Sequence, residues 1–273
     1  MAVSAKAGEP DRYLAALLAP PSARDGLLAL AAFSAELGRV GQLVTREPMM
    51  GEIRLQWWRD ALQPAGAGML TGSPIADALR GAVARHHLPA PLLLGMIDEH
   101  GRDLEAKPFP TQAALESYLV AGEGAQFELA VQVLGGPATF ELQAASKSAG
   151  RAYGLVRLLL ALPHMLALGR LPLPRERLQQ AGMADLLSDT DPARIAALMR
   201  DLHAEILLNF EAARQHVANL PRPLLVAFLP LALVHPYLRA LDRPGRDSLR
   251  EIAEVAPIRR IWAIARAHWL GRM

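Results

Sequence analysis

The chain of 273 residues contains no cysteine, and only three of its 29 basic residues are lysines. The absence of cysteine excludes disulfides, thiolate nucleophiles and thiolate metal sites, and it fits a reducing cytoplasm. Positive charge is carried almost entirely by arginine, and the formal net charge is only +2. This balance gives no reason to expect a nucleic-acid partner.

Signals for export or membrane insertion are also missing from the sequence. The N-terminal stretch MAVSAKAGEPDRY lacks the apolar core of a secretory signal. The longest apolar run, residues 223–234, is shorter than a membrane span. We therefore expect a cytoplasmic protein in which residues 1–10 form a flexible N-terminus.

Strand patterns are nearly absent, whereas apolar residues recur three and four positions apart through most of the chain. This spacing is typical of helices with one buried face and predicts an all-α fold. The connections are short and no internal repeat is found, so residues 1–273 are expected to form a single domain. The predicted helices cover about residues 22–45, 49–62, 74–86, 91–105, 111–134, 138–168, 192–219, 223–241 and 257–270.

Three stretches occur in an informative order. They are RYLAALLAPPSARDGLLALAAFSAELGRVGQLVTREPMMGEIRLQWWRDAL at residues 12–62, YLVAGEGAQFELAVQVLGG at 118–136, and AGRAYGLVRLLLALPHMLALGRLPLPRERLQQAGM at 149–183. In this order they resemble the squalene/phytoene synthase family, all-α enzymes that join two prenyl diphosphates head to head. The resemblance implies an isoprenoid-synthase-like bundle of helices around a central, mostly apolar cavity.

Active members of this family hold Mg²⁺ with two Asp-x-x-x-Asp motifs on facing helices. Mg²⁺ prefers oxygen ligands, and residues four apart share one helical face. When the Gly-Arg-x-x-x-Pro turn at residues 169–174 is used as the anchor, the second aspartate pair falls on Ala161 and Met165. Residues 143–174 contain no Asp or Glu, so a shift of the alignment does not restore this motif.

The first aspartate motif is missing in the same way. With Phe33 as the anchor, its two positions are Gly38 and Gln42. No acid within residues 25–60 has an acidic partner four positions away. The resemblance therefore implies that both Mg²⁺ motifs are lost, and we expect no metal site, no cofactor and no catalytic residue at these four positions.

A narrower resemblance agrees with this loss. The combination of AAFSAELGRV, EIRLQWWRDAL and a tryptophan-bearing terminal helix is similar to one branch of the family. That branch contains the mitochondrial assembly factor for NADH dehydrogenase (respiratory complex I) and is regarded as non-catalytic. The resemblance implies a pseudoenzyme that acts as a binding or assembly factor, with a complex I subunit or assembly intermediate as its partner.

Two other functions stay open at this stage. The first is an active prenyl diphosphate transferase whose metal ligands have moved, for example to Glu99 and Asp103, with Mg²⁺ as its cofactor. The second is a carrier that keeps the cavity and binds an isoprenoid or another lipid. Loss of the acids alone does not separate these functions from assembly.

The densest group of polar and aromatic residues lies at residues 36–59. Successive helical residues turn by about 100°, so Trp57 and Trp58 face different sides and one of them can meet a ligand, lipid or partner. The alternative is that both pack in the core, with Arg54 or Arg59 paired to Glu36 or Asp60. The binding candidates in this group are Glu36, Arg39, Arg54, Trp57, Trp58 and Arg59.

A second group of binding candidates comprises Arg151, Tyr153, Arg157 and Arg170. Tyr153 and Arg157 share a helical face and could hold an anionic head group, because arginine binds phosphate without a metal. The alternative is an internal salt bridge or an exposed helix edge.

The terminal segment PIRRIWAIARAHWLGRM has its large apolar residues on one face and its arginines largely off that face. Such a helix can make peripheral contact with an anionic membrane surface, such as the inner membrane, or with a membrane-bound partner. The alternative is a final helix that docks on the domain through its apolar face.

Overall fold

The computed structural model describes residues 1–43, 48–63, 70–105, 107–183, 186, 191–218 and 220–273. Every regular element within these ranges is helical, which confirms the predicted all-α class. The elements are, in chain order, α1 (Ala2–Gly8), α2 (Pro10–Leu17), α3 (Pro21–Leu43), α4 (Pro48–Leu62), α5 (Pro74–His86), α6 (Ala90–His100), η1 (Arg102–Leu104), α7 (Gln112–Leu119), η2 (Val120–Gly124), α8 (Ala125–Val133), α9 (Phe140–Ala167), α10 (Arg175–Gln180), α11 (Pro192–Val217), α12 (Arg222–Phe228), η3 (Leu229–Leu233), α13 (Val234–Leu241) and α14 (Pro257–Leu270).

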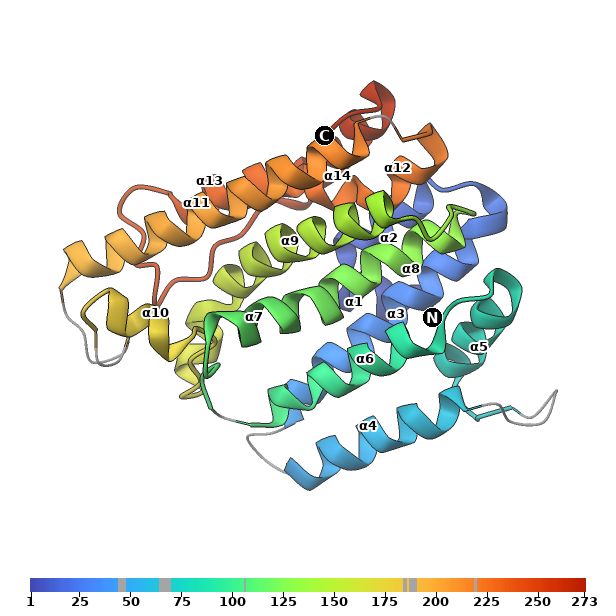
Figure 1. Ribbon diagram of the computed structural model, residues 1–273, viewed down its shortest axis with the longest axis horizontal. Helices are drawn as coiled ribbons and strands as arrows, with labels where there is room; N and C mark the ends of the chain where they lie inside the picture. The colour runs from blue at the N-terminus through green and yellow to red at the C-terminus, as the bar shows by residue number, and fades with distance from the viewer. Residues whose placement is uncertain (44–47, 64–69, 106, 184–185, 187–190, 219) are drawn as a thin grey trace.

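The long helices lie side by side along the long axis of the molecule (Figure 1). In this view α4 lies along the lower edge and α11 along the upper edge, with α3 and α9 between them. Helix α9 packs along α11 and contacts η2 and α8, whereas α3 packs against α1, α4, α5 and α8. The core is therefore built around α3 and α9, the two helices on which the sequence places the aspartate-motif positions.

Several helices begin where the sequence provides a capping side chain. The hydroxyls of Thr111 and Thr139 accept hydrogen bonds from the backbone N–H groups of Ala114 and Leu142, at 3.1 and 3.3 Å. The carboxylate of Asp191 does the same for Ala193 before α11. A side chain that accepts from the first turn satisfies an N–H group with no partner inside the helix, which fixes the starting residue.

Helices α7 and α8 are joined through η2, a π-helical turn. This turn lies against α9 at a point where each of the two segments carries a glycine. A Cβ atom on Gly150 would lie 2.4 Å from the backbone nitrogen of Gly124, a separation that side chains do not tolerate. Glycine at 150 therefore lets the backbones of α9 and η2 touch, and this contact brings Glu123 of η2 against α9 near Gly154.

The N-terminus corrects one expectation from the sequence. The predicted flexible stretch, residues 1–10, instead forms α1 and the start of α2, and Ala5 is fully buried. Helix α1 packs closely on α3, where a Cβ on Gly8 would lie 2.5 Å from that of Ala35. Contacts between small residues bring helices together without the large apolar side chains on which the sequence pattern depends. Helices α2 and α10 are likewise absent from the helices that the sequence predicts.

The apolar run at 223–234, taken alone shorter than a membrane span, lies within a longer helical segment that matches the predicted helix at 223–241. The chain is helical from Arg222 to Leu241, and this 20-residue segment, with a mean hydropathy of 1.7, is long and apolar enough to cross a membrane. In the structure 78% of it is buried, and Phe228 and Leu233 lie in the core. Packing against the rest of the domain therefore accounts for its apolar character.

Candidate functional site

A cavity of about 610 Å³, partly open to solvent, lies between α3, α6, η1, α7, η2 and α9. Gly38 on α3 lines it, as do Ala161 and Met165 on α9. Three positions that the alignment assigns to aspartates of two distant motifs therefore face the same space. The fourth, Gln42, has a side chain that lies outside the described residues.

The side chains at these three positions do not fit a Mg²⁺ site. Glycine, alanine and methionine offer no side-chain oxygen, and Mg²⁺ is held in proteins through carboxylates and other oxygen ligands. Across the described part of the chain, no three His, Cys, Asp or Glu residues gather in a way that could hold a metal ion. These three positions therefore supply none of the oxygen ligands with which Mg²⁺ assists the departure of a diphosphate.

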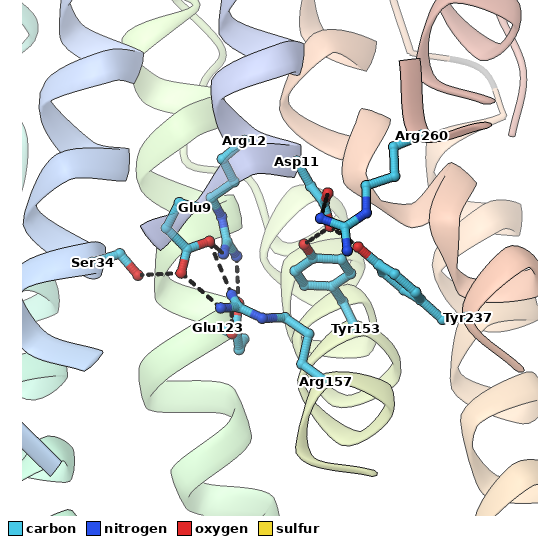
Figure 2. A network of polar contacts seen from close by, with 9 residues as sticks. All are labelled: Glu9, Asp11, Arg12, Ser34, Glu123, Tyr153, Arg157, Tyr237 and Arg260. Atoms are coloured by element: carbon cyan, nitrogen blue, oxygen red, sulfur yellow. Dashed lines mark hydrogen bonds and ion pairs between the residues drawn. The ribbon is translucent and has the colours of Figure 1, made fainter. Parts of the chain in front are cut away.

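Glu9, Asp103, Glu105 and Glu123 line the cavity, and arginines hold the carboxylates of Glu9 and Glu123. Arg157 of α9 contacts Glu9 through both terminal nitrogens, each at 2.9 Å, and Nη1 also lies 2.9 Å from Oε1 of Glu123. Arg12 of α2 bonds Glu9 at 2.8 Å and also contacts Glu123. Figure 2 shows the two guanidinium groups and two carboxylates drawn together between the helices. We call Glu9, Arg12, Glu123 and Arg157 the charge cluster.

The electrostatics of the charge cluster favour the ionised forms of Glu123 and Arg157. Burial disfavours ionisation of Glu123, but Arg12 and Arg157 outweigh it and lower the pKa of this carboxyl. Burial likewise works against the charged form of Arg157, but Glu9 and Glu123 raise its pKa well above the ordinary value. Two negative and two positive charges thus neutralise each other, and both carboxylates are already engaged.

The second group of binding candidates includes Arg157, Tyr153 and Arg151, and each of them makes contacts within the protein. Arg157 lines the cavity, but its guanidinium makes internal ion pairs, the alternative to holding a head group. Tyr153 is buried, and its hydroxyl donates to Asp11 at 2.7 Å. Arg151 lies away from the cavity and pairs with Glu116 at 3.5 Å.

A second network begins beside the charge cluster and ties four helices together (Figure 2). The hydroxyls of Tyr153 on α9 and Tyr237 on α13 both donate to Oδ2 of Asp11 on α2. Arg260 of α14 lies 3.8 Å from the other oxygen of the same carboxylate. Burial, and then the charge of Asp11, raises the pKa of Tyr153 well above its ordinary value, so its hydroxyl remains a donor.

Arg170 and Asp103 also line the cavity. The buried guanidinium of Arg170 donates to the carbonyls of Gly41, at 3.0 Å, and of Asp103. The Asp103 carboxylate accepts from the hydroxyl of Tyr118 at 3.0 Å, and burial raises the pKa of Asp103. Arg170 therefore joins the end of α3 to η1 and to the turn that follows α9.

The proposed relocation of metal ligands to Glu99 and Asp103 does not match this geometry. Asp103 lines the cavity, whereas Glu99 lies outside its lining and pairs with Arg102 at 3.0 Å. Helix α6 ends at His100, so the two acids do not share one helical face as the sequence spacing suggests.

The first group of candidates lies away from the cavity. Trp58 is buried with its ring edge against Phe33, 4.9 Å between centroids, whereas Trp57 is partly exposed on α4. Buried Glu36 binds Arg39 and Arg54, each at 2.5 Å. Arg59 pairs with Asp98 at 2.7 Å, not with the acids expected from the sequence. None of the six candidates in this group lines the cavity.

Sequence reasoning missed three members of the charge cluster. Glu123 stood in the second informative stretch, where a single acid between two glycines was a usable signal. Glu9 and Arg12 lay in or beside the stretch expected to be flexible, and Glu9 is 148 residues from Arg157. No local pattern connects residues so far apart.

The fold and the cavity define a class of protein. The model of the squalene/phytoene synthase family matches residues 5–262, and the chain belongs to that family. Among solved structures, squalene synthase of Alicyclobacillus acidocaldarius superposes with a TM-score of 0.73 at 20% identity, over 89% of this chain and 92% of that one. A dehydrosqualene synthase gives a TM-score of 0.72 at 17% identity, over 97% and 93%. The isoprenoid-synthase-like fold is thereby confirmed.

Two kinds of relative share sequence with this chain. Assembly factor 6 of NADH dehydrogenase (ubiquinone) complex I from Rattus norvegicus is 29% identical over 239 residues, 87% of this chain and 71% of the relative. Presqualene diphosphate synthase from Zymomonas mobilis is 25% identical over 257 residues, 93% of this chain and 87% of the relative. The relatives of this chain thus include both an assembly factor and an enzyme.

Proposed function

We propose that this protein is a non-catalytic member of the squalene/phytoene synthase family that acts in the assembly of respiratory complex I. One observation carries the first half of this proposal. The cavity positions where the alignment expects aspartates are Gly38, Ala161 and Met165. The carboxylates of Glu9 and Glu123, which also line the cavity, are bound by Arg157.

The chemistry of the enzymes explains why this matters. Departure of a diphosphate requires cations to neutralise the charge that develops on the leaving group. In this cavity Arg157 is committed to two carboxylates and Arg170 to two backbone carbonyls. Neither a metal nor a free guanidinium of this pair is then available to the leaving group.

The second half of the proposal is supported by the relatives. The assembly factors match most of this chain, and a non-catalytic role is consistent with a cavity that offers no Mg²⁺ ligands at the motif positions. We place the protein in the cytoplasm, peripheral to the inner membrane, where it would meet a complex I subunit or assembly intermediate.

Removal of the gene from its own host tests this role. We expect membranes of the deletion strain to contain less assembled complex I on native gels and to oxidise NADH more slowly. The wild-type gene should restore both. Full complex I levels without the gene would contradict the assembly role, whatever the protein does with prenyl diphosphates.

Binding of an isoprenoid or another lipid is a second candidate, because the cavity of about 610 Å³ stays open although Ala161 and Met165 replace acids. A space of this size is in the range that small-molecule ligands occupy. Mass spectrometry of lipid extracted from the purified protein tests it. The carrier function predicts that lipid is extracted from the wild-type protein and not from Ala161→Trp. If neither protein yields lipid, the carrier function is contradicted.

A further inference from the structure

Helix α14 turns its large apolar side chains toward solvent. Ile258, Trp262 and Trp269 are 62%, 60% and 67% exposed, and their spacing of four and seven residues puts them on one face. The helix docks on the domain through its other side, where Ile264 and Ala267 are buried. The alternative in which the helix docks on the domain through its wide apolar face is therefore wrong.

The exposed face of α14 is continuous. The rings of Trp262 and Trp269 contact each other edge to face, 6.5 Å between centroids, and Ile261 and Leu270 extend the apolar surface to either side. Isolated exposed apolar residues are ordinary, but a contiguous patch with two tryptophans indicates an interaction surface. Tryptophan combines a large apolar ring with a polar N–H group and favours the boundary between water and lipid.

The acidic and basic side chains within the terminal segment have one sign of charge. Arg259, Arg266 and Arg272 are exposed, and residues 255–273 contain no Asp or Glu. Arg222 approaches the end of the helix at Gly271 and adds to the same charge. Arginines that flank an apolar face match a surface that combines hydrocarbon with negative head groups.

The helix is also fixed in its orientation. Arg260 points inward, 3.8 Å from the Asp11 carboxylate and with its guanidinium over the ring of Tyr237 (Figure 2). Because this anchor holds the buried side of α14, the apolar face stays outward.

We propose that the exposed face of α14 binds the surface of a lipid bilayer that contains anionic lipids, with Trp262 and Trp269 inserted at the interface. A second copy of the chain is a poorer occupant. In a symmetric dimer the same patch meets itself, so the arginines around one α14 would face those around the other with no acid between them. This inference is independent of the complex I role.

Co-sedimentation of the purified full-length protein with vesicles tests the proposal. The vesicles are phosphatidylcholine alone or phosphatidylcholine mixed with phosphatidylglycerol. We expect binding to the mixed vesicles that weakens as salt is raised, and much weaker binding to phosphatidylcholine alone. Trp262→Ala/Trp269→Ala and Arg259→Glu/Arg266→Glu should each weaken binding about tenfold or more.

Matched controls are available elsewhere on the surface. Met49 and Leu208 are as exposed as the two tryptophans, and Arg85 and Arg200 are exposed arginines on other helices. Met49→Ala/Leu208→Ala and Arg85→Glu/Arg200→Glu should leave vesicle binding within about twofold of wild type. Circular dichroism checks that each variant keeps its fold.

Three results would overturn the proposal. They are an absence of binding to the mixed vesicles, equal binding by the α14 variants and their controls, or equal binding to neutral and anionic vesicles. Lipid-independent dimerisation that the tryptophan substitutions abolish, with no vesicle binding, would instead assign the face to a second copy.

Discussion

Arg157 and Glu9 form a two-pronged ion pair in which both terminal nitrogens of the guanidinium lie 2.9 Å from the carboxylate. The pair joins the start of α2 to the middle of α9, the helix that carries Ala161 and Met165. In this protein the charges beside the cavity therefore bind each other. The aspartate-motif positions carry no acid, and the charged residues that remain beside the cavity hold helices together.

Substitution of Arg12 tests how much the charge cluster contributes to the fold. Arg12 and Glu9 are both buried, so Arg12→Met leaves one negative charge in excess within the protein. We expect the free energy of unfolding in urea to fall by about 3 kcal/mol or more.

A surface pair provides the matched control for this experiment. Arg214 and Glu211 also form an arginine–carboxylate pair three residues apart, but their side chains are 48% and 45% exposed. Arg214→Met should leave the urea midpoint of unfolding close to that of wild type, because exposed ion pairs contribute little to stability. Equal losses in Arg12→Met and Arg214→Met would contradict a structural role for the charge cluster.

The pKa of Glu123 predicts how stability depends on pH. Although burial opposes its ionisation, the arginines lower its pKa in the folded state below that of the unfolded chain, about 4.3. The ionised carboxylate therefore contributes stability above that pH, and the contribution is lost as the pH falls through the lower folded value. Glu123→Gln should be destabilised most at neutral pH, and its difference from wild type should shrink as the pH falls below about 4.3. A difference that is constant from neutral to acidic pH would contradict this assignment.

Asp103 should behave in the opposite way. Burial raises its pKa in the folded state above the unfolded value of about 3.9, so its ionisation costs stability as the pH rises through and beyond that value. Asp103→Asn keeps an acceptor for Tyr118 and removes this cost. We expect urea denaturation to show a variant equal to wild type near about pH 3 and more stable at neutral pH. A variant that is less stable at neutral pH would disprove the predicted sign.

Substitution by alanine should have opposite effects at Gly150 and Gly38, because only Gly150 lies in a close contact between two backbones. In Gly150→Ala the new methyl group would meet the backbone of Gly124 at 2.4 Å, so we expect a loss of about 3 kcal/mol or more. Nothing lies within 4 Å of a Cβ on Gly38, which is helical and lines the cavity. Gly38→Ala should therefore raise the free energy of unfolding by about 0.5–1 kcal/mol. Thermal and urea unfolding of both variants provide the measurement, and similar effects at the two sites would contradict this packing.

Local pattern was enough to predict the all-α class and the order of the long helices. The resemblance to the synthase family, and not local pattern, placed Gly38, Ala161 and Met165 at one cavity, because the aligned stretches carry landmarks at fixed spacing. Pattern failed where helices pack through alanine and glycine, as α1 does on α3 near Ala35.

The partners of Arg157 could not be read from the sequence, because an ion pair leaves no periodic signal when its members are 148 residues apart. The exposed face of α14 was misjudged for a related reason. Apolar spacing identified the face correctly, but only packing against η3 and α2 decides which side of the helix is buried.

The most direct measurement is pyrophosphate release by purified protein supplied with farnesyl or geranylgeranyl diphosphate, Mg²⁺ and NADPH, against a control that contains chelator. Circular dichroism of the same sample establishes that the protein is folded. The account predicts no release above the chelated control, because the cavity offers no carboxylate at Gly38, Ala161 or Met165. Release that requires Mg²⁺ and disappears with chelator would show that the protein is an enzyme and would contradict the account.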